Sequence, residues 1–316
     1  MNEIEPQSVE KKENGLDLTN VIGTAIQIPG VKIARESFLR EQFKGLPKEE
    51  IDLIIEKGPI EAGRSRTELK KMAKKIIKER AAITTSASFL AGLPGGWAMV
   101  ATIPADMLQF YGVALRMAQE LVYLYGEEDM WCEGAPDPDR VTNQLILYCG
   151  VMLGASGAAQ AVRVMSSALA KQALKKLPQK ALTKTFYYPV IKSILKFFGV
   201  SVTKNSFAKA VSKVVPVIGG VVSGGITLAS ILPMGNRLLD TLDKAHFDYT
   251  EKDFQDDMND ISSINDEENN DQKVLIEKNS QEEILEKIKK AKQMFDDGTI
   301  TEEEYTEIKT KLISQM

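Results

Sequence analysis

The chain has 316 residues, 43% of them hydrophobic and 27% charged, and its formal net charge is −4. These fractions are those of a globular protein, and they exclude a wholly disordered chain or a collagen-like fibre. Two cysteines and one histidine exclude a dense disulfide framework, most zinc sites and most Ser-His-Asp arrangements. The polar residues 1–19 contain no apolar signal segment, and we expect them to be disordered.

Charge is strongly segregated along the chain. No acidic residue occurs between Val141 and Leu239, and this stretch, the acid-free region, has 12 lysines and arginines. The following segment 251–272 has nine acidic residues and one lysine, a net charge of 1 − 9 = −8. The asymmetry indicates an anionic partner for the basic part. The acidic segment is then either a solubilising spacer or a cover for the basic surface.

The first predicted helices follow residue 20. Pro47 with two glutamates after it marks a helix start, and apolar residues at helical spacing predict a basic amphipathic helix over 66–80. Three uncharged runs come next, at 81–105, 141–162 and 214–236. Each is long enough to span a bilayer.

The composition of these runs favours packed helical hairpins over spanning segments, because glycine, alanine, serine and threonine contribute little to membrane insertion. Both interpretations stay open. Each run has two glycines four residues apart, which would let helices approach closely: Gly92/Gly96, Gly150/Gly154 and Gly220/Gly224.

The clearest predicted helix covers 104–125, with Pro104 at its first position and Gly126 after its last. Most of its side chains are apolar, so we expect it to be largely buried. A narrow polar stripe along it is either a solvated face or a polar groove, and only a groove could hold an unrecognised catalytic site. The stripe contains Asp106, Gln109, Arg116 and Glu120.

Lysines in the acid-free region recur four residues apart, opposite apolar side chains. The pattern is sharpest over 189–198, which predicts a basic amphipathic helix of the kind that binds membrane interfaces. The candidate residues for contact with a membrane or another anion are Lys171, Lys175, Lys192, Lys196, Phe197, Phe198, Lys209 and Lys213.

The C-terminal residues 281–316 predict a compact helical hairpin. Asp297 and Gly298 end its first helix, and Thr301 with Glu304 forms a capping box that begins the second, next to Tyr305. A hairpin of this size cannot bury a core of its own. It must therefore self-associate, dock on the rest of the chain or bind a partner.

Two stretches resemble known families. The segments AGLPGG (91–96), IPADMLQF (103–110) and VPVIGGVVSGGI (215–226), with Asn236, make residues 20–250 similar to the EcsC family, for which no biochemical activity is implied. The turn from Gly298 to Tyr305 is similar to the SHOCT module, which implies oligomerisation or anchoring and a bacterial cytoplasmic protein. Asn236 joins the polar-groove candidates.

The predicted architecture is an all-α, compact multi-helix bundle with glycine-rich helical hairpins. It comprises a disordered N-terminus (1–19), a helical core (20–250), a flexible acidic linker (251–280) and the C-terminal hairpin (281–316).

The sequence contains no HExxH, GxSxG or dinucleotide-binding motif. We therefore expect no cofactor, no metal and no identifiable small-molecule substrate. His246 is expected to pack or cap a helix rather than bind a ligand, and the cysteines are expected to be ordinary thiols.

The favoured function is a non-enzymatic interaction protein at the inner face of the cell membrane. Its basic surface would contact anionic lipid and its hairpin would bind a partner or a second copy. The alternatives are an enzyme with a site around Asp106 and Arg116, and an integral membrane protein. Nucleic acid is not expected as a partner, because the sequence pI is near 5.4 and the lysines alternate with apolar residues.

Overall fold

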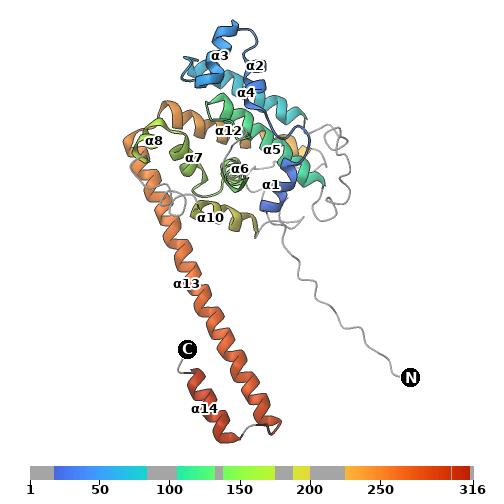
Figure 1. The fold of residues 1–316 in the computed structure, drawn as a ribbon, viewed down its shortest axis with the longest axis vertical. Coiled ribbons are helices and arrows are strands. Elements are labelled where there is room, and N and C mark those ends of the chain that lie inside the picture. The colour runs from blue at the N-terminus through green and yellow to red at the C-terminus, as the bar shows by residue number, and fades with distance from the viewer. Residues whose placement is uncertain are drawn as a thin grey trace, which may run out of the picture. The chain divides into compact units, whose positions relative to one another are not determined.

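The computed structural model describes residues 18–83, 105–131, 138–174, 188–199, 225–299 and 301–313. All regular elements in these ranges are α-helices, which confirms the predicted all-α fold (Figure 1). The chain divides after Ile261 into two compact units, 1–261 and 262–316. The helices are α1 (Leu18–Ile26), α2 (Arg35–Gln42), α3 (Lys48–Lys57), α4 (Arg66–Ile83), α5 (Ala105–Leu124), α6 (Pro138–Leu153), α7 (Ala158–Ser166), α8 (Ala168–Leu174), α10 (Tyr188–Gly199), α12 (Gly225–Phe247), α13 (Glu251–Asp296) and α14 (Glu302–Ile313).

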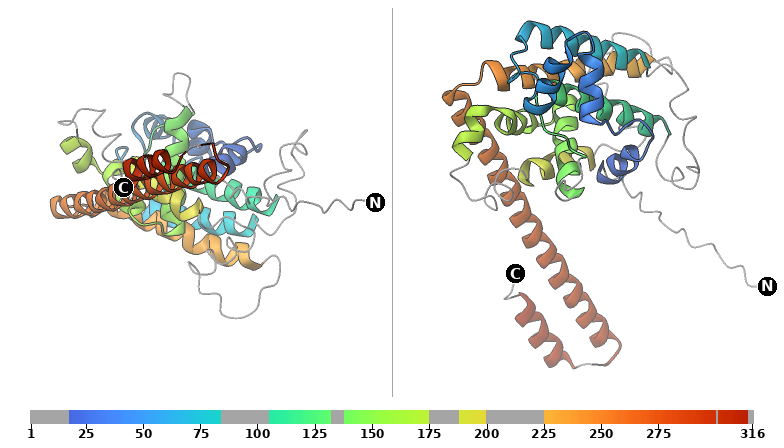
Figure 2. Two further views of the ribbon diagram at one scale, coloured as in Figure 1. Left: turned by 90° about the horizontal axis from the view of Figure 1, so that it is seen from below. Right: turned by 45° about the horizontal axis from the view of Figure 1, so that its top comes forward.

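Helix α5 forms the centre of the first unit, as its apolar sequence predicts. From Met107 to Leu124 its side chains are buried, except for Gln109 and Arg116, which are half-buried. Helices α1, α2, α4, α6 and α12 all pack against it, and the two views of Figure 2 show it among them. A helix that is apolar on nearly all sides must be enclosed in this way, because any open face would expose hydrocarbon to water.

The uncharged run 141–162 forms two helices of the core. Helix α6 ends at Leu153, and α7 begins at Ala158 after a turn in which Gly154 and Gly157 both have a φ of +76°. This confirms a packed helical hairpin for this run. Gly154 was wrongly placed on a helix face with Gly150, because it lies in the turn, where its left-handed backbone favours glycine.

The close-approach prediction holds for Gly150. A Cβ atom at this position would lie 2.6 Å from Ile194 Cδ1 of α10 and 3.0 Å from Ala158 Cβ of α7. The pairs Gly92/Gly96 and Gly220/Gly224 lie outside the described residues. Within the described part of the chain, none of the helices is both long and apolar enough to cross a membrane.

The apolar face of α10 is part of the core. Val190, Ile191 and Ile194 are buried, and α10 packs against α6, α1 and α7. The expectation that this face contacts lipid is therefore wrong for these residues. Periodicity cannot distinguish the two cases, because a basic amphipathic helix can bury its apolar face in protein or in lipid.

The acidic segment 251–280, expected to be a flexible linker, is helical throughout as part of α13. Thr250 caps its first turn: its Oγ1 accepts a hydrogen bond from the Asp253 N–H and donates one to Asp253 Oδ2. Acidic side chains near a helix start also interact favourably with its positive end. Phe254, Met258 and Ile261 follow at spacings of four and three residues and pack on the core, so this helix start belongs to the first unit.

In the second unit, α14 follows the end of α13 after a tight turn. Gly298 in this turn has a φ of +70°. The predicted capping box is confirmed, because the Glu304 N–H donates to Thr301 Oγ1 over 3.3 Å and the Thr301 N–H donates to Glu304 Oε2 over 2.8 Å. The rings of Phe295 and Tyr305 stack with their centroids 5.5 Å apart and hold the two helices together.

Candidate functional site

The predicted polar stripe on α5 contains a buried ion-pair network. Glu120 is only 1% exposed, so a solvated face is the wrong description of this part of the stripe. Arg80 of α4 donates to both of its carboxylate oxygens over 2.6 Å, and Arg116 Nε donates to Oε1 over 3.1 Å. Arg116 also donates to the Gly30 carbonyl over 2.6 Å, and thereby ties α5 to the loop after α1.

The remaining polar-groove candidates take different places. Gln109 is half-buried, and Asn236 lies exposed on α12. The side chain of Asp106 lies outside the described residues. Because Arg116 is engaged by Glu120 and Gly30, its contacts in this structure are those of a residue that fixes the packing of the core.

Gln119, which sequence analysis did not single out, is a second polar clamp on α5. Its side chain is fully buried, and its Oε1 accepts hydrogen bonds from the Ile33 N–H and the Trp131 indole N–H. Its amide nitrogen donates to the Val31 carbonyl over 2.9 Å. Gln119 thereby satisfies the buried backbone N–H of Ile33 and the backbone carbonyl of Val31.

A second ionic cluster surrounds Asp243 of α12, which is also buried. Arg66 and Lys70 of α4 both donate to its carboxylate, Lys70 over 2.9 Å, and the Tyr125 hydroxyl donates to it over 3.4 Å. Burial alone would raise the pKa of Asp243, but the hydrogen bonds from Arg66 and Lys70 outweigh it and hold this pKa below its ordinary value. Arg66 also pairs with Asp248, so the two cations of the cluster, Arg66 and Lys70, face two carboxylates.

His246 lies beside this cluster, with its ring centroid 5.8 Å from that of Tyr125. Its Nε2 atom is buried without a hydrogen-bond partner. Burial, helped by the positive charge of Lys171, lowers its pKa to about 4, so the ring is neutral at physiological pH. Such an environment suits a packing residue, the role that the sequence favoured.

Neither a reactive thiol nor a metal site is found among the residues that the structure describes. Burial raises the pKa of the Cys149 thiol to about 12, which leaves it protonated and unreactive. Among the residues that the structure describes, no three histidine, cysteine, aspartate or glutamate side chains are grouped so that they could hold a metal ion.

The anion-contact candidates are only partly described. Lys171 is exposed, with its Nζ 3.9 Å from Glu127 Oε1, and on α10 Lys192 is half-buried and Lys196 exposed. The side chains of Lys175, Lys209, Lys213, Phe197 and Phe198 lie outside the described residues.

The acidic start of α13 contacts the acid-free region. Asp257 is buried and accepts hydrogen bonds from Arg163 of α7, over 2.9 Å from its Nε, and from the Tyr249 hydroxyl over 2.8 Å. Gln160 donates to Asp260 over 3.1 Å. This part of the acidic segment therefore pairs with one basic residue of the acid-free region, Arg163.

The C-terminal hairpin leaves large apolar side chains in contact with water. Met294 is 39% exposed and Ile308 is 37% exposed. Ile288, Phe295, Tyr305 and Leu312 are half-buried, and Ala291 is the single fully buried residue among the side chains described in 287–299 and 301–312. The hairpin thus presents an apolar surface that its own two helices do not close.

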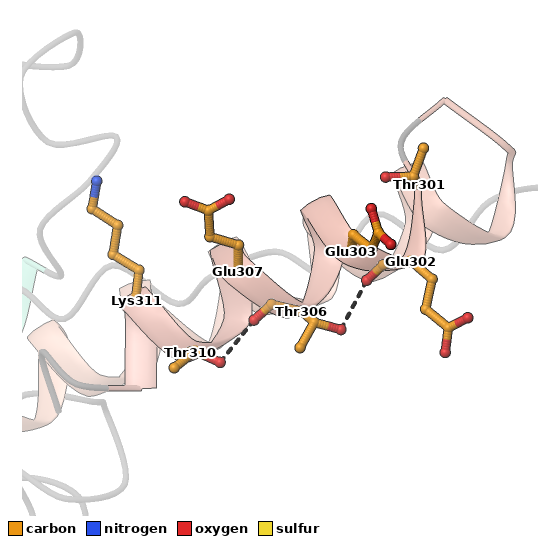
Figure 3. Close-up of a pocket in the computed structure, with 7 residues that line it drawn as sticks. All are labelled: Thr301, Glu302, Glu303, Thr306, Glu307, Thr310 and Lys311. Atoms are coloured by element: carbon orange, nitrogen blue, oxygen red, sulfur yellow. Dashed lines mark hydrogen bonds between the residues drawn. The ribbon is translucent and has the colours of Figure 1, made fainter.

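Another face of α14 forms a shallow, open surface (Figure 3). The threonines there satisfy the helix backbone: Thr306 donates to the Glu302 carbonyl and Thr310 to the Thr306 carbonyl, each over 2.8 Å. The hydroxyls of these two threonines are thus engaged within the helix. The open surface is lined by Thr301, Glu302, Glu303, Thr306, Glu307, Thr310 and Lys311.

Comparison with known proteins identifies the hairpin. A family model described as SHOCT, short C-terminal domain, matches residues 286–313. No curated protein and no solved structure is similar to the chain. None of these comparisons supports the resemblance of residues 20–250 to the EcsC family. The described part of the chain is thus all-α, and the chain carries a SHOCT domain at residues 286–313.

Proposed function

We propose that the protein is a non-enzymatic assembly protein whose C-terminal hairpin joins copies of the chain. One observation carries the proposal: the half-exposed apolar side chains of the hairpin, Met294 and Ile308 above all. A pair of helices without a third element cannot enclose its apolar faces, whereas two hairpins together make a four-helix arrangement that can.

The interaction chemistry of the hairpin supports this proposal. The apolar residues are bordered by charges of both signs, with exposed lysines on α13 and exposed glutamates at the start of α14. Apolar centres with charged borders are typical of helical association surfaces. The match to the SHOCT family over 286–313 lies on this same segment.

The test uses two full-length copies with different affinity tags, purified together from a mixture through one tag. The wild type is expected to carry over the second tag, and Ile308→Asp is expected to abolish carry-over. Leu53→Asp on α3 is the matched control, because Leu53 is 38% exposed, nearly the same as Ile308. Equal carry-over by wild type and Ile308→Asp, or none by wild type, would refute the proposal.

A second candidate function is attachment to an anionic membrane surface. The acid-free region and its 12 basic residues support it, and each lysine or arginine near such a surface adds about 1 kcal/mol. Because the apolar face of α10 lies in the core, this attachment would be electrostatic and peripheral. Its test is sedimentation with anionic vesicles and release by high salt.

A further inference from the structure

The outward face of α4 is lined by four exposed lysines, Lys71, Lys74, Lys75 and Lys78, which we call the α4 lysine face. At 100° per residue they lie within an arc of about 100°, over about 10 Å of the helix. The opposite side of α4 is buried in the core through Leu69, Ala73, Ile76 and Ile77. The lysines are therefore held on a packed helix.

Few acidic groups balance this face. Thr67 and Ala82 are the exposed residues that extend the same arc at either end. Two glutamates border it: Glu79, with its carboxylate 3.7 Å from Lys75 Nζ, and Glu68, which pairs with Arg64. The other cations of the helix are engaged elsewhere, because Arg66 and Lys70 pair with Asp243 and Arg80 pairs with Glu120.

The spacing of the lysines works against helix stability. Lys71 and Lys75, and likewise Lys74 and Lys78, are four residues apart, so each pair brings like charges together on one side of the helix. An anionic partner would remove this repulsion and gain from all four charges together. Repulsion within the face is thus a physical reason to expect an anion against it.

The chemistry of the face fits a lipid surface better than a nucleic acid. The four cations are lysines, which act as point charges and do not form the bidentate contacts of arginine. No aromatic residue occurs in 66–83 on which a base could stack. Four flexible ammonium groups on a convex helix match a surface of spread phosphate charges, as in an anionic bilayer.

We infer that the α4 lysine face is the surface through which this protein contacts anionic membranes. The inference rests on the second candidate function and moves the contact from the acid-free region to α4. Each lysine near an anionic bilayer raises partitioning roughly fivefold, so loss of all four lowers it roughly several hundredfold. The contact is exposed to solvent, so it must weaken steeply as salt rises.

The experiment measures sedimentation of the full chain with vesicles of phosphatidylcholine containing about one third phosphatidylserine, and with pure phosphatidylcholine, at low and high salt. The test variant replaces Lys71, Lys74, Lys75 and Lys78 by glutamine. A matched control has the same change in net charge and replaces four other exposed lysines by glutamine: Lys44, Lys48, Lys57 and Lys252. A third variant replaces Lys171, Lys192 and Lys196.

The wild type and the matched control are expected to bind the anionic vesicles alone and to be released by salt, and the α4 variant to lose at least a hundredfold in partitioning. Lys71→Gln with Lys78→Gln should give an intermediate loss at unchanged helix content, which excludes misfolding as the cause.

Two outcomes would overturn the inference while membrane attachment stands: strong binding by the α4 variant, or loss confined to the third variant. Absence of wild-type binding would overturn both. Tighter binding of the wild type to a random DNA duplex than to the vesicles, at the same salt, would show that the partner is a nucleic acid.

Discussion

Replacing Glu120 by glutamine removes one negative charge from the buried network on α5 and keeps the shape of the side chain. In the native protein this carboxylate accepts both hydrogen bonds of Arg80 and one from Arg116. After the change, Arg116 keeps its bond to the Gly30 carbonyl, whereas Arg80 has no remaining anion among the contacts described for it. The cost therefore comes mainly from the uncompensated charge of Arg80.

The size of this cost follows from the burial of the pair. Removing one partner of a buried ion pair destabilises a protein by about 3–5 kcal/mol. The Arg80 side chain is 19% exposed, so water screens part of its charge, and the lower end of this range applies. We expect Glu120→Gln to lower the free energy of unfolding by about 3 kcal/mol.

Urea unfolding measures this change, with Trp131 as the probe. Its indole N–H donates to Gln119, the residue next to Glu120, so its fluorescence reports on this region. The chain has two tryptophans, and a Trp97→Phe background leaves Trp131 alone. At a slope of about 3 kcal/mol per M urea, the midpoint should fall by about 1 M.

Glu36→Gln is the matched control, because Glu36 and Arg40 are also four residues apart on one helix but are exposed to solvent. Water screens the charges of an exposed pair, so Glu36→Gln should shift the midpoint little. If Glu120→Gln shifts the midpoint no more than Glu36→Gln does, the network around Glu120 does not hold the core together.

Three further predictions follow from the packing. Burial and Lys171 lower the pKa of His246 to about 4, so the unfolded state binds the proton more readily than the folded state. The contribution of His246 to the unfolding free energy should therefore be constant above pH 6.5 and fall by about 3 kcal/mol toward pH 4. Urea midpoints measured across this range should lose this contribution in His246→Gln. Asp257→Asn breaks the buried pair with Arg163 and should speed hydrogen exchange of residues 254–261. Asp256→Asn, at an exposed position, should not change these rates. Equal rates in both variants would contradict the docking of α13. Gly150→Ala should destabilise the protein by about 1–3 kcal/mol in a thermal unfolding assay, because the new Cβ atom would lie 2.6 Å from Ile194. In the same assay Gly23→Ala should be neutral or stabilising, because its new Cβ atom would meet no other atom within 4 Å.

Patterns confined to one helix or one turn could be predicted from the sequence. The apolar composition of 104–125 predicts a buried helix, and α5 is one. Gly298, Thr301 and Glu304 specify the hairpin turn through backbone conformation and capping, which need no distant contact. The same reasoning locates the segment that the SHOCT family model matches.

Features that depend on a distant partner were harder to predict. The acidic residues of 251–272 suggest a flexible chain, but Phe254, Met258 and Ile261 fix the helix start on the core, and Asp257 finds Arg163 at a separation of 94 residues. Similarly, Asp243 becomes the centre of a buried ionic cluster only because α12 packs against α4. The spacing of apolar residues around Asp257 was the available signal, and the high local charge concealed it.

The central claim, that the C-terminal hairpin joins copies of the chain, is tested most directly by the mass of the full-length protein in solution. Sedimentation velocity over about 1–100 µM should give a mass above the 34.9 kDa of one chain that increases with concentration, and Ile308→Asp should return it to one chain while Leu53→Asp does not. A wild-type mass of 34.9 kDa at every concentration would contradict the account.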